Sequence, residues 1–134
     1  MININQGYLS DTKNFIFIPE IFQLIRDANN LGYLVFIITN QSGIGRGFFT
    51  EEDFNSLSSW MLNRLSTQGA NINKIYFSPF HPTHGKGQYL KDDFSRKPNP
   101  GMIMDAAKEF NLDFDQSLLV GDSITDIIAG NRAG

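Results

Sequence analysis

The chain has 134 residues, enough for one domain with its own hydrophobic core. Its net charge of −3 argues against a protein that binds nucleic acid through bulk positive charge. Cysteine is absent, which excludes disulfides and thiolate zinc sites, and no apolar run approaches the roughly 20 residues of a membrane span. The first residues lack the pattern of a signal peptide, so we expect a cytoplasmic protein.

Apolar residues recur at helical spacing in several parts of the chain. We expect helices from Pro19 to about Asn29, from Glu51 to about Gln68, from Pro100 to Phe110 and from Ile124 to Arg132. Thr50 is the expected N-cap of the second helix and Asn99 that of the third, since short polar side chains satisfy the first backbone N–H groups of a helix.

Three apolar runs between these helices predict strands. The first, 33–38, is rich in β-branched and aromatic residues and is typical of a strand buried on both faces. The others are 75–77 and 117–120. Alternating strands and helices predict an α/β domain with a parallel sheet. Three strands make a thin sheet, so we expect the chain to be part of a single domain, incomplete at both ends, with a loop insertion at about 79–99.

Three polar clusters follow strands or precede helices. They are Thr39–Ser42, Arg96–Lys97, and Gly121–Asp122 with Asp126 one turn further on. Parallel strands end at the same sheet edge, and hydroxyls, a lysine and carboxylates are what phosphoryl transfer requires. Each cluster also has a simpler explanation: an ordinary strand exit, a solvated basic pair, or residues that cap a helix. Their order and spacing together favour the phosphate interpretation.

The sequence resembles the haloacid-dehalogenase (HAD) superfamily, and within it the D-glycero-D-manno-heptose 1,7-bisphosphate phosphatases and their histidinol-phosphatase relatives. The resemblance rests above all on TNQSGIGRG at 39–47, RKPNPGM at 96–102 and VGDSITDIIAG at 120–130. It extends over nearly the whole chain, from Asn3–Tyr8 through Phe49–Glu51 to His81–Pro82. It implies a HAD-like Rossmannoid three-layer fold and a cytoplasmic, Mg²⁺-dependent phosphatase that acts on a sugar bisphosphate.

The same resemblance implies roles for individual residues. Thr39 and Lys97 would hold the transferring phosphoryl group, and Arg96 would recognise the second phosphate of the substrate. Asp122 would ligate Mg²⁺, with Asp126 behind it. Further substrate-binding positions would be Asn5, Gln6, Gly7, Tyr8, Asn40, Gln41, Ser42 and Ser123. Where the family has an acid and a histidine, this chain has Asn5 and Gln6, which leaves the sugar specificity open.

Two departures from the family matter. The family's nucleophile lies in an Asp-x-Asp-Gly motif that would fall just before Ile2, and no such motif occurs in the sequence. We therefore expect the 134-residue polypeptide alone to be inactive. The family's zinc ligands would fall at Ser78, Phe80, Asp93 and Ser95, none of which is a thiolate or an imidazole, so we expect the loop to lack zinc.

The leading hypothesis is thus a monomeric heptose bisphosphate phosphatase whose partner is a small sugar phosphate, with no nucleic acid and no membrane. The alternatives are an enzyme like the histidinol-phosphatases and one like the polynucleotide 3′-phosphatases, a family that shares the TNQ-x-GI-x-RG loop. A non-catalytic sugar-phosphate binder is the alternative from another class.

Overall fold

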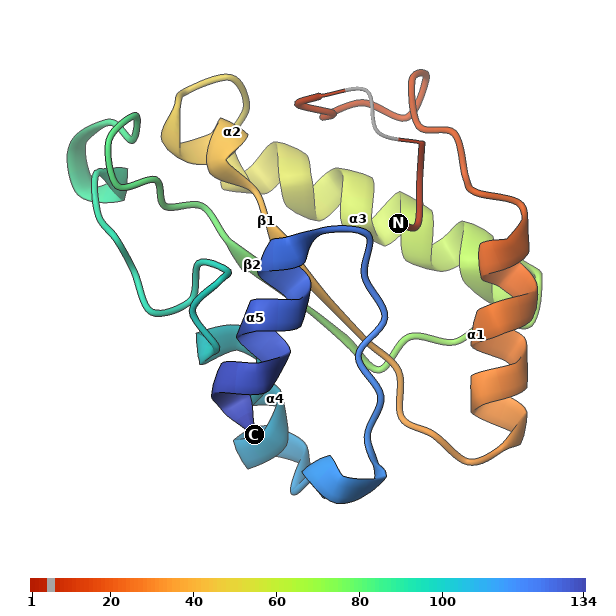
Figure 1. The fold of residues 1–134 in the computed structure, drawn as a ribbon. Coiled ribbons are helices and arrows are strands. Elements are labelled where there is room, and N and C mark those ends of the chain that lie inside the picture. The colour runs from red at the N-terminus through yellow and green to blue at the C-terminus, as the bar shows by residue number, and fades with distance from the viewer. Residues whose placement is uncertain (5–6) are drawn as a thin grey trace. The chain divides into compact units, whose positions relative to one another are not determined.

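The computed structural model describes residues 1–4 and 7–134, which form a mixed α/β structure with a parallel sheet (Figure 1). The helices are α1 Glu20–Asn30, α2 Ser42–Gly45, α3 Glu51–Thr67, α4 Gly101–Phe110 and α5 Ile124–Ala133. The strands are β1 Phe36–Asn40 and β2 Lys74–Ser78, and the short 3-10 turns are Gly87–Tyr89 and Phe114–Gln116. Within the described ranges, no helix is both long and apolar enough to cross a membrane.

The two strands pair with each other in parallel. The amide of Asn73 donates to the Val35 carbonyl, and at the other end the amide of Gln41 donates to the Ser78 carbonyl, both at 2.7 Å. The partners ascend together along both strands, as a parallel ladder requires. The predicted α/β fold with a parallel sheet is confirmed.

The prediction for the first strand was wrong in two respects. The strand begins at Phe36 and includes Thr39 and Asn40, whereas Tyr33 and Leu34 precede it and remain 41% and 47% exposed. All five strand residues are only partly buried. The reason is that β1 has one hydrogen-bonded neighbour in the described part of the chain, so it is not the centre of a sheet.

The predicted strand at 117–120 is not a strand in the structure. The segment forms no ladder, and Leu118 is 80% exposed. It still packs on α5, because a Cβ placed on Gly130 would lie 2.7 Å from Leu119 Cδ2. An apolar run can form a strand only where another strand offers it hydrogen bonds, and local composition does not reveal that partner.

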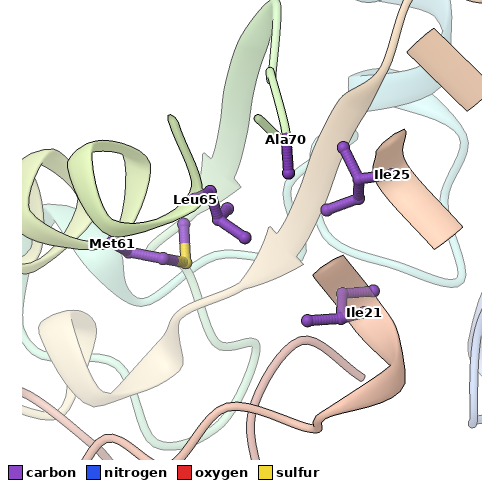
Figure 2. Packing of buried hydrophobic residues seen from close by; sticks show 5 residues of the cluster. All are labelled: Ile21, Ile25, Met61, Leu65 and Ala70. Carbon is purple, nitrogen blue, oxygen red and sulfur yellow. The ribbon is translucent and has the colours of Figure 1, made fainter. Parts of the chain in front are cut away.

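The chain divides into two compact units, the first comprising 1–37 and 48–75 and the second 38–47 and 76–134. The core of the first unit is built by α1 and α3, as Figure 2 shows. Ile21 and Ile25, four residues apart on α1, face Met61 and Leu65, four apart on α3, and Leu65 is fully buried. In each pair the two apolar residues are spaced as on one face of a helix, and this spacing was the basis for predicting both helices.

The ends of α1 and α3 are set by local signals. Pro19 precedes the first turn of α1, and Gly32 ends it with φ at +88°, a conformation that glycine adopts without steric cost. Thr50 caps α3 as predicted, and its side chain and that of Asp53 form a reciprocal capping box. Both helices therefore lie close to their predicted positions.

In the second unit, α4 and α5 pack against each other, with Met102, Ala106 and Ala129 buried. The predicted cap of α4 was wrong. The helix begins after Pro100 with no side-chain cap, and the Nδ2 of the Asn99 side chain donates to the Asp93 carbonyl at 3.0 Å instead. A side chain that folds back onto the preceding loop is not available to the helix.

Candidate functional site

The first polar cluster lies at the carboxyl end of β1. Thr39 and Asn40 are the last residues of the strand, Gln41 precedes α2, and Ser42 is the first residue of α2. The Gln41 side chain donates from Nε2 to Thr39 Oγ1 at 3.0 Å, which fixes that hydroxyl. The structure thus places the four polar residues at the strand edge, as the sequence predicted.

Asn40 joins the first cluster to the second. Its Nδ2 donates to the Lys97 carbonyl at 3.1 Å, while its Oδ1 accepts from the Lys97 amide at 2.9 Å. The two residues are 57 positions apart in the sequence. One side-chain amide therefore satisfies both backbone polar groups of Lys97, as a neighbouring strand residue would.

Lys97 joins the second cluster to the third. Its Nζ forms an ion pair with Asp126 Oδ1, and the two side chains are only 14% and 9% exposed. The other carboxylate oxygen of Asp126 accepts from the Ser123 amide at 3.2 Å, and the two residues form the capping box of α5. An opposite charge and a backbone donor satisfy the buried carboxylate, which would be costly to bury alone.

Gly121 lets Asp126 reach this position. A Cβ at Gly121 would lie 2.5 Å from Asp126 Oδ2 and 2.6 Å from its Cγ, closer than any side chain can approach. Asp122, the next residue, is exposed at the start of α5. Both carboxylate oxygens of Asp126 are engaged, one by the Lys97 ammonium and the other by the Ser123 amide.

The donor set fits magnesium better than it fits a caged metal. In the described residues no group of three or more His, Cys, Asp or Glu side chains could hold a metal ion. Mg²⁺ is commonly held by one or two carboxylates together with substrate phosphate oxygens and water. Asp122 could serve as such a carboxylate.

Arg96 is held by the loop that precedes it. Its amide donates to the Asp93 carbonyl at 3.0 Å, and its Nη1 donates to the Phe80 carbonyl at 3.2 Å. The residue is half-buried, directly before Lys97. The backbone of the basic pair is therefore fixed at both residues.

Hydroxyl and carboxylate groups close the base of the loop 79–99. Ser95 Oγ donates to Oγ of the fully buried Ser78 at 2.8 Å, and the Ser95 amide donates to Asp93 Oδ2 at 3.0 Å. Burial raises the pKa of Asp93, but the hydrogen bonds from Ser95 and the charge of Lys91 outweigh burial and hold the pKa below its ordinary value. Asp93 is therefore an ionised acceptor at neutral pH.

His81 is held as a neutral ring. Its Nδ1 accepts from the backbone amides of Thr83 at 3.1 Å and His84 at 2.9 Å, so the ring proton belongs on Nε2. Burial lowers the pKa of His81, and the charges of Arg96, Arg46 and His84 lower it further.

Comparison with known proteins identifies the family. The chain is 49% identical over its whole length to the D-glycero-alpha-D-manno-heptose-1,7-bisphosphate 7-phosphatase of Burkholderia mallei and covers 71% of that protein. It is 42% identical over 132 residues to the corresponding beta-anomer enzyme of Pasteurella multocida, again covering 71%. Residues 94–134 match the model of a HAD-hydrolase-like family. The chain belongs to the heptose 1,7-bisphosphate 7-phosphatase family.

Solved structures agree with this assignment. A HAD-like protein from Mesorhizobium loti superposes with a TM-score of 0.94 at 37% identity, over 99% of this chain and 64% of that one. The D,D-heptose 1,7-bisphosphate phosphatase from B. bronchiseptica, complexed with magnesium and phosphate, gives 0.85 at 29% identity, over 99% and 71%. The predicted HAD-like fold and family are confirmed.

Four predicted sugar-site residues of the family belong to the N-terminal part of the sequence, at 5–8. Gly7 and Tyr8 belong to the first unit, where the Tyr8 ring meets Phe48 edge-on with centroids 4.9 Å apart. Asn5 and Gln6 lie outside the described residues. Their role in substrate binding stays a prediction.

Sequence reasoning missed the two contacts that assemble the cluster. The sequence named Asn40 as a substrate residue and Asp126 as a residue behind the metal, whereas the structure shows both holding Lys97. Only Asp126 carried a signal, since Ser123 followed by Asp126 is a capping-box pattern.

Proposed function

We propose that this chain contributes the phosphate-binding part of a phosphatase acting on D-glycero-D-manno-heptose 1,7-bisphosphate. The observation that carries the proposal is the way Lys97 is held: Asn40, at the end of β1, binds its backbone, and Asp126 pairs with its ammonium group. A lysine whose backbone is held by Asn40, which lies between the hydroxyl-bearing Thr39 and Ser42 in the sequence, suits a phosphoryl group whose oxygens gain charge during transfer. The relatives named above act on this sugar bisphosphate, which supports the choice of substrate.

Each residue then has a defined task. The Thr39 hydroxyl donates to a phosphoryl oxygen and Lys97 neutralises charge on another, while Arg96 pairs with the second phosphate. Ser42, at the start of α2, and Ser123, at the start of α5, add polar groups around the sugar phosphate. Asp122 would hold Mg²⁺, which supplies further neutralisation of the phosphate oxygens when bound.

The attacking aspartate of this chemistry has no counterpart in the printed sequence, which holds no Asp-x-Asp-Gly. The proposal therefore predicts ligand binding without turnover for these 134 residues. Release of phosphate from the heptose bisphosphate above a Lys97→Ala control would contradict it. Sequencing the DNA on both sides of the reading frame shows whether a strand ending in Asp-x-Asp-Gly is encoded next to this chain.

Calorimetric titration tests the binding itself. With Mg²⁺ present, heptose 1,7-bisphosphate should bind, and Lys97→Ala should weaken binding about tenfold or more, because a charge-assisted hydrogen bond is lost. Lys108→Ala is the matched control, since this lysine lies in the last turn of α4. A 3′-phosphorylated oligonucleotide or histidinol phosphate that bound more tightly than the heptose compound would replace the proposed substrate.

The proposal also includes the oligomeric state, the cellular location and the partners of the protein. A small acidic protein with a net charge of −3 suits a monomer that binds a small molecule in the cytoplasm, without nucleic acid or membrane. The serine pair Ser78 and Ser95 at the base of the loop supports a loop that closes without zinc. In that case a zinc chelator should leave the melting temperature unchanged.

A further inference from the structure

The side chain of Asn40 is committed to the backbone of another residue. Its two hydrogen bonds, at 2.9 and 3.1 Å, go to the amide and the carbonyl of Lys97, and both residues are half-buried. A side-chain amide has one acceptor oxygen and two N–H groups, so these bonds use its oxygen and one of its N–H groups. The two bonds fix the plane of the Asn40 side-chain amide against the backbone of Lys97, much as backbone hydrogen bonds fix neighbouring strands in a sheet.

Lys97 is consequently held at both ends. Asn40 fixes its backbone against the last residue of β1, and Asp126 holds its ammonium group. A lysine side chain has four rotatable bonds and would otherwise sample many rotamers. With its backbone held by Asn40 and its Nζ by Asp126, the charge of Lys97 stays at one place.

We infer that Asn40 is a positioning residue that acts on bound phosphate through Lys97 and not by touching the ligand. The inference rests on the proposed function for its consequence in binding, but the hold on Lys97 can be measured without any ligand. It assigns Asn40 a role different from its neighbours Gln41 and Ser42, although the sequence places all three in one loop.

The first unit contains the same arrangement at a residue to which the proposed function gives no role, which supplies a matched control. Asn29 Nδ2 donates to the Asn71 carbonyl at 3.0 Å, and Asn29 Oδ1 accepts from the Asn71 amide at 2.8 Å. Asn29 is half-buried too. Asn29→Ala thus removes the same pair of bonds as Asn40→Ala, but from the backbone of Asn71 instead of Lys97.

The test is a double-mutant cycle read by titration of the 134-residue chain with inorganic phosphate in the presence of MgCl₂. We expect Asn40→Ala and Lys97→Ala each to weaken phosphate binding about tenfold, and the double variant to be no weaker than Lys97→Ala alone. Asn29→Ala should bind phosphate like the unchanged chain. A further loss when Asn40→Ala is added to Lys97→Ala means that Asn40 touches the ligand, and it overturns the inference.

Amide hydrogen exchange gives a second readout that needs no phosphate. Asn40→Ala should speed exchange of the Lys97 amide about tenfold or more and leave the Asn71 amide unchanged, and Asn29→Ala should do the reverse. An unchanged Lys97 amide overturns the inference. If Asn40→Ala does not fold, Asn40→Asp keeps the acceptor for the Lys97 amide and loses the donor to its carbonyl. We then expect slow exchange but weaker phosphate binding, and unweakened binding overturns the inference.

The two readouts separate this inference from the proposed function. If Lys97→Ala binds phosphate as well as the unchanged chain, the proposed function fails, because the lysine is not part of a phosphate site. The exchange rate of the Lys97 amide still decides whether Asn40 holds it.

Discussion

Two asparagine side chains make the same pair of hydrogen bonds, one in each unit. Asn29 binds the amide and carbonyl of Asn71, and Asn40 binds those of Lys97. We call each pair of hydrogen bonds a clamp. The first clamp, Asn29 to Asn71, connects the chain that follows α3 to the end of α1. The second ties a lysine, whose ammonium meets a buried carboxylate, to the end of β1.

The difference lies in what each clamp fixes. Asn71 has a short neutral side chain, so its clamp gives only local order. Lys97 carries a charge about 6 Å from its backbone by the length of its extended stem, so the hold on its backbone and the ion pair with Asp126 together fix the position of that charge. The two pairs of hydrogen bonds have the same geometry, so the geometry alone does not indicate a functional site. What distinguishes the second pair is that it holds a residue with a charged side chain.

The largest effect should come from removing the core behind the first clamp. Leu65→Ala takes away the largest fully buried apolar side chain and should lower the free energy of unfolding by about 3 kcal/mol. Urea denaturation measures this change. In spectra of the folded state, the Asn71 amide resonance should shift more than that of Lys97, and the reverse would show that the clamps are not separately supported.

A smaller effect should come from removing the charge behind the second clamp. Asp126→Asn keeps the size of the side chain but leaves the Lys97 ammonium without its anion, which should cost about 2 kcal/mol of unfolding free energy. Denaturation at low and at high salt measures the loss. Since the pair is shielded from solvent, a loss that disappears in high salt would show that the ion pair is exposed.

Removing the N-cap side chain of each capping box should have smaller and similar effects on the free energy of unfolding. Thr50→Ala at α3 and Ser123→Ala at α5 each remove an N-cap acceptor and should cost about 1 kcal/mol. Ser123→Ala should also weaken phosphate binding, because the proposed function places the Ser123 hydroxyl among the polar groups around the phosphate. Thr50→Ala, in the other unit, is the control, and equal effects of both variants on binding would contradict the comparison.

The smallest effect should be the contribution of His81, a residue of the second unit, to the pH dependence of the unfolding free energy. The folded pKa of His81 lies below its ordinary value of 6.5, so the unfolded chain takes up the proton first as the pH falls. The stability that neutral His81 contributes is therefore present above about pH 6.5 and is lost as the pH falls below it. Comparing unfolding free energies at about pH 7.5 and about pH 5.5, His81→Asn should show a smaller decrease than the unchanged chain. An equal decrease would assign the pH dependence to other groups.

Local signals made most helices predictable from the sequence. Pro19 and Gly32 bound α1, and the Thr50–Asp53 box begins α3, because these effects act between residues a few positions apart. The cap of α4 failed for the opposite reason. Asn99 is a good capping residue by type, but its side-chain Nδ2 donates to the Asp93 carbonyl. The sequence around α4 does not reveal this contact.

Strand boundaries and site contacts depended on distant residues and were less predictable. The segments 33–34 and 117–120 have the composition of buried strands but form no strand in the described structure. For the site, the family motifs indicated which residues gather. They did not show that Asn40 binds the Lys97 backbone, because the two lie 57 positions apart and either side chain has other plausible partners.

The bond between Ser95 and Ser78 has a consequence for where this protein can work. It joins two alcohols, one of them fully buried, and neither can be oxidised to a disulfide or stripped of a metal. A loop closed by thiolates and zinc opens under peroxide stress or zinc starvation. The bond between Ser95 and Ser78 depends on neither condition, so this contact near the basic pair Arg96 and Lys97 should persist in a cell whose redox state and zinc supply fluctuate.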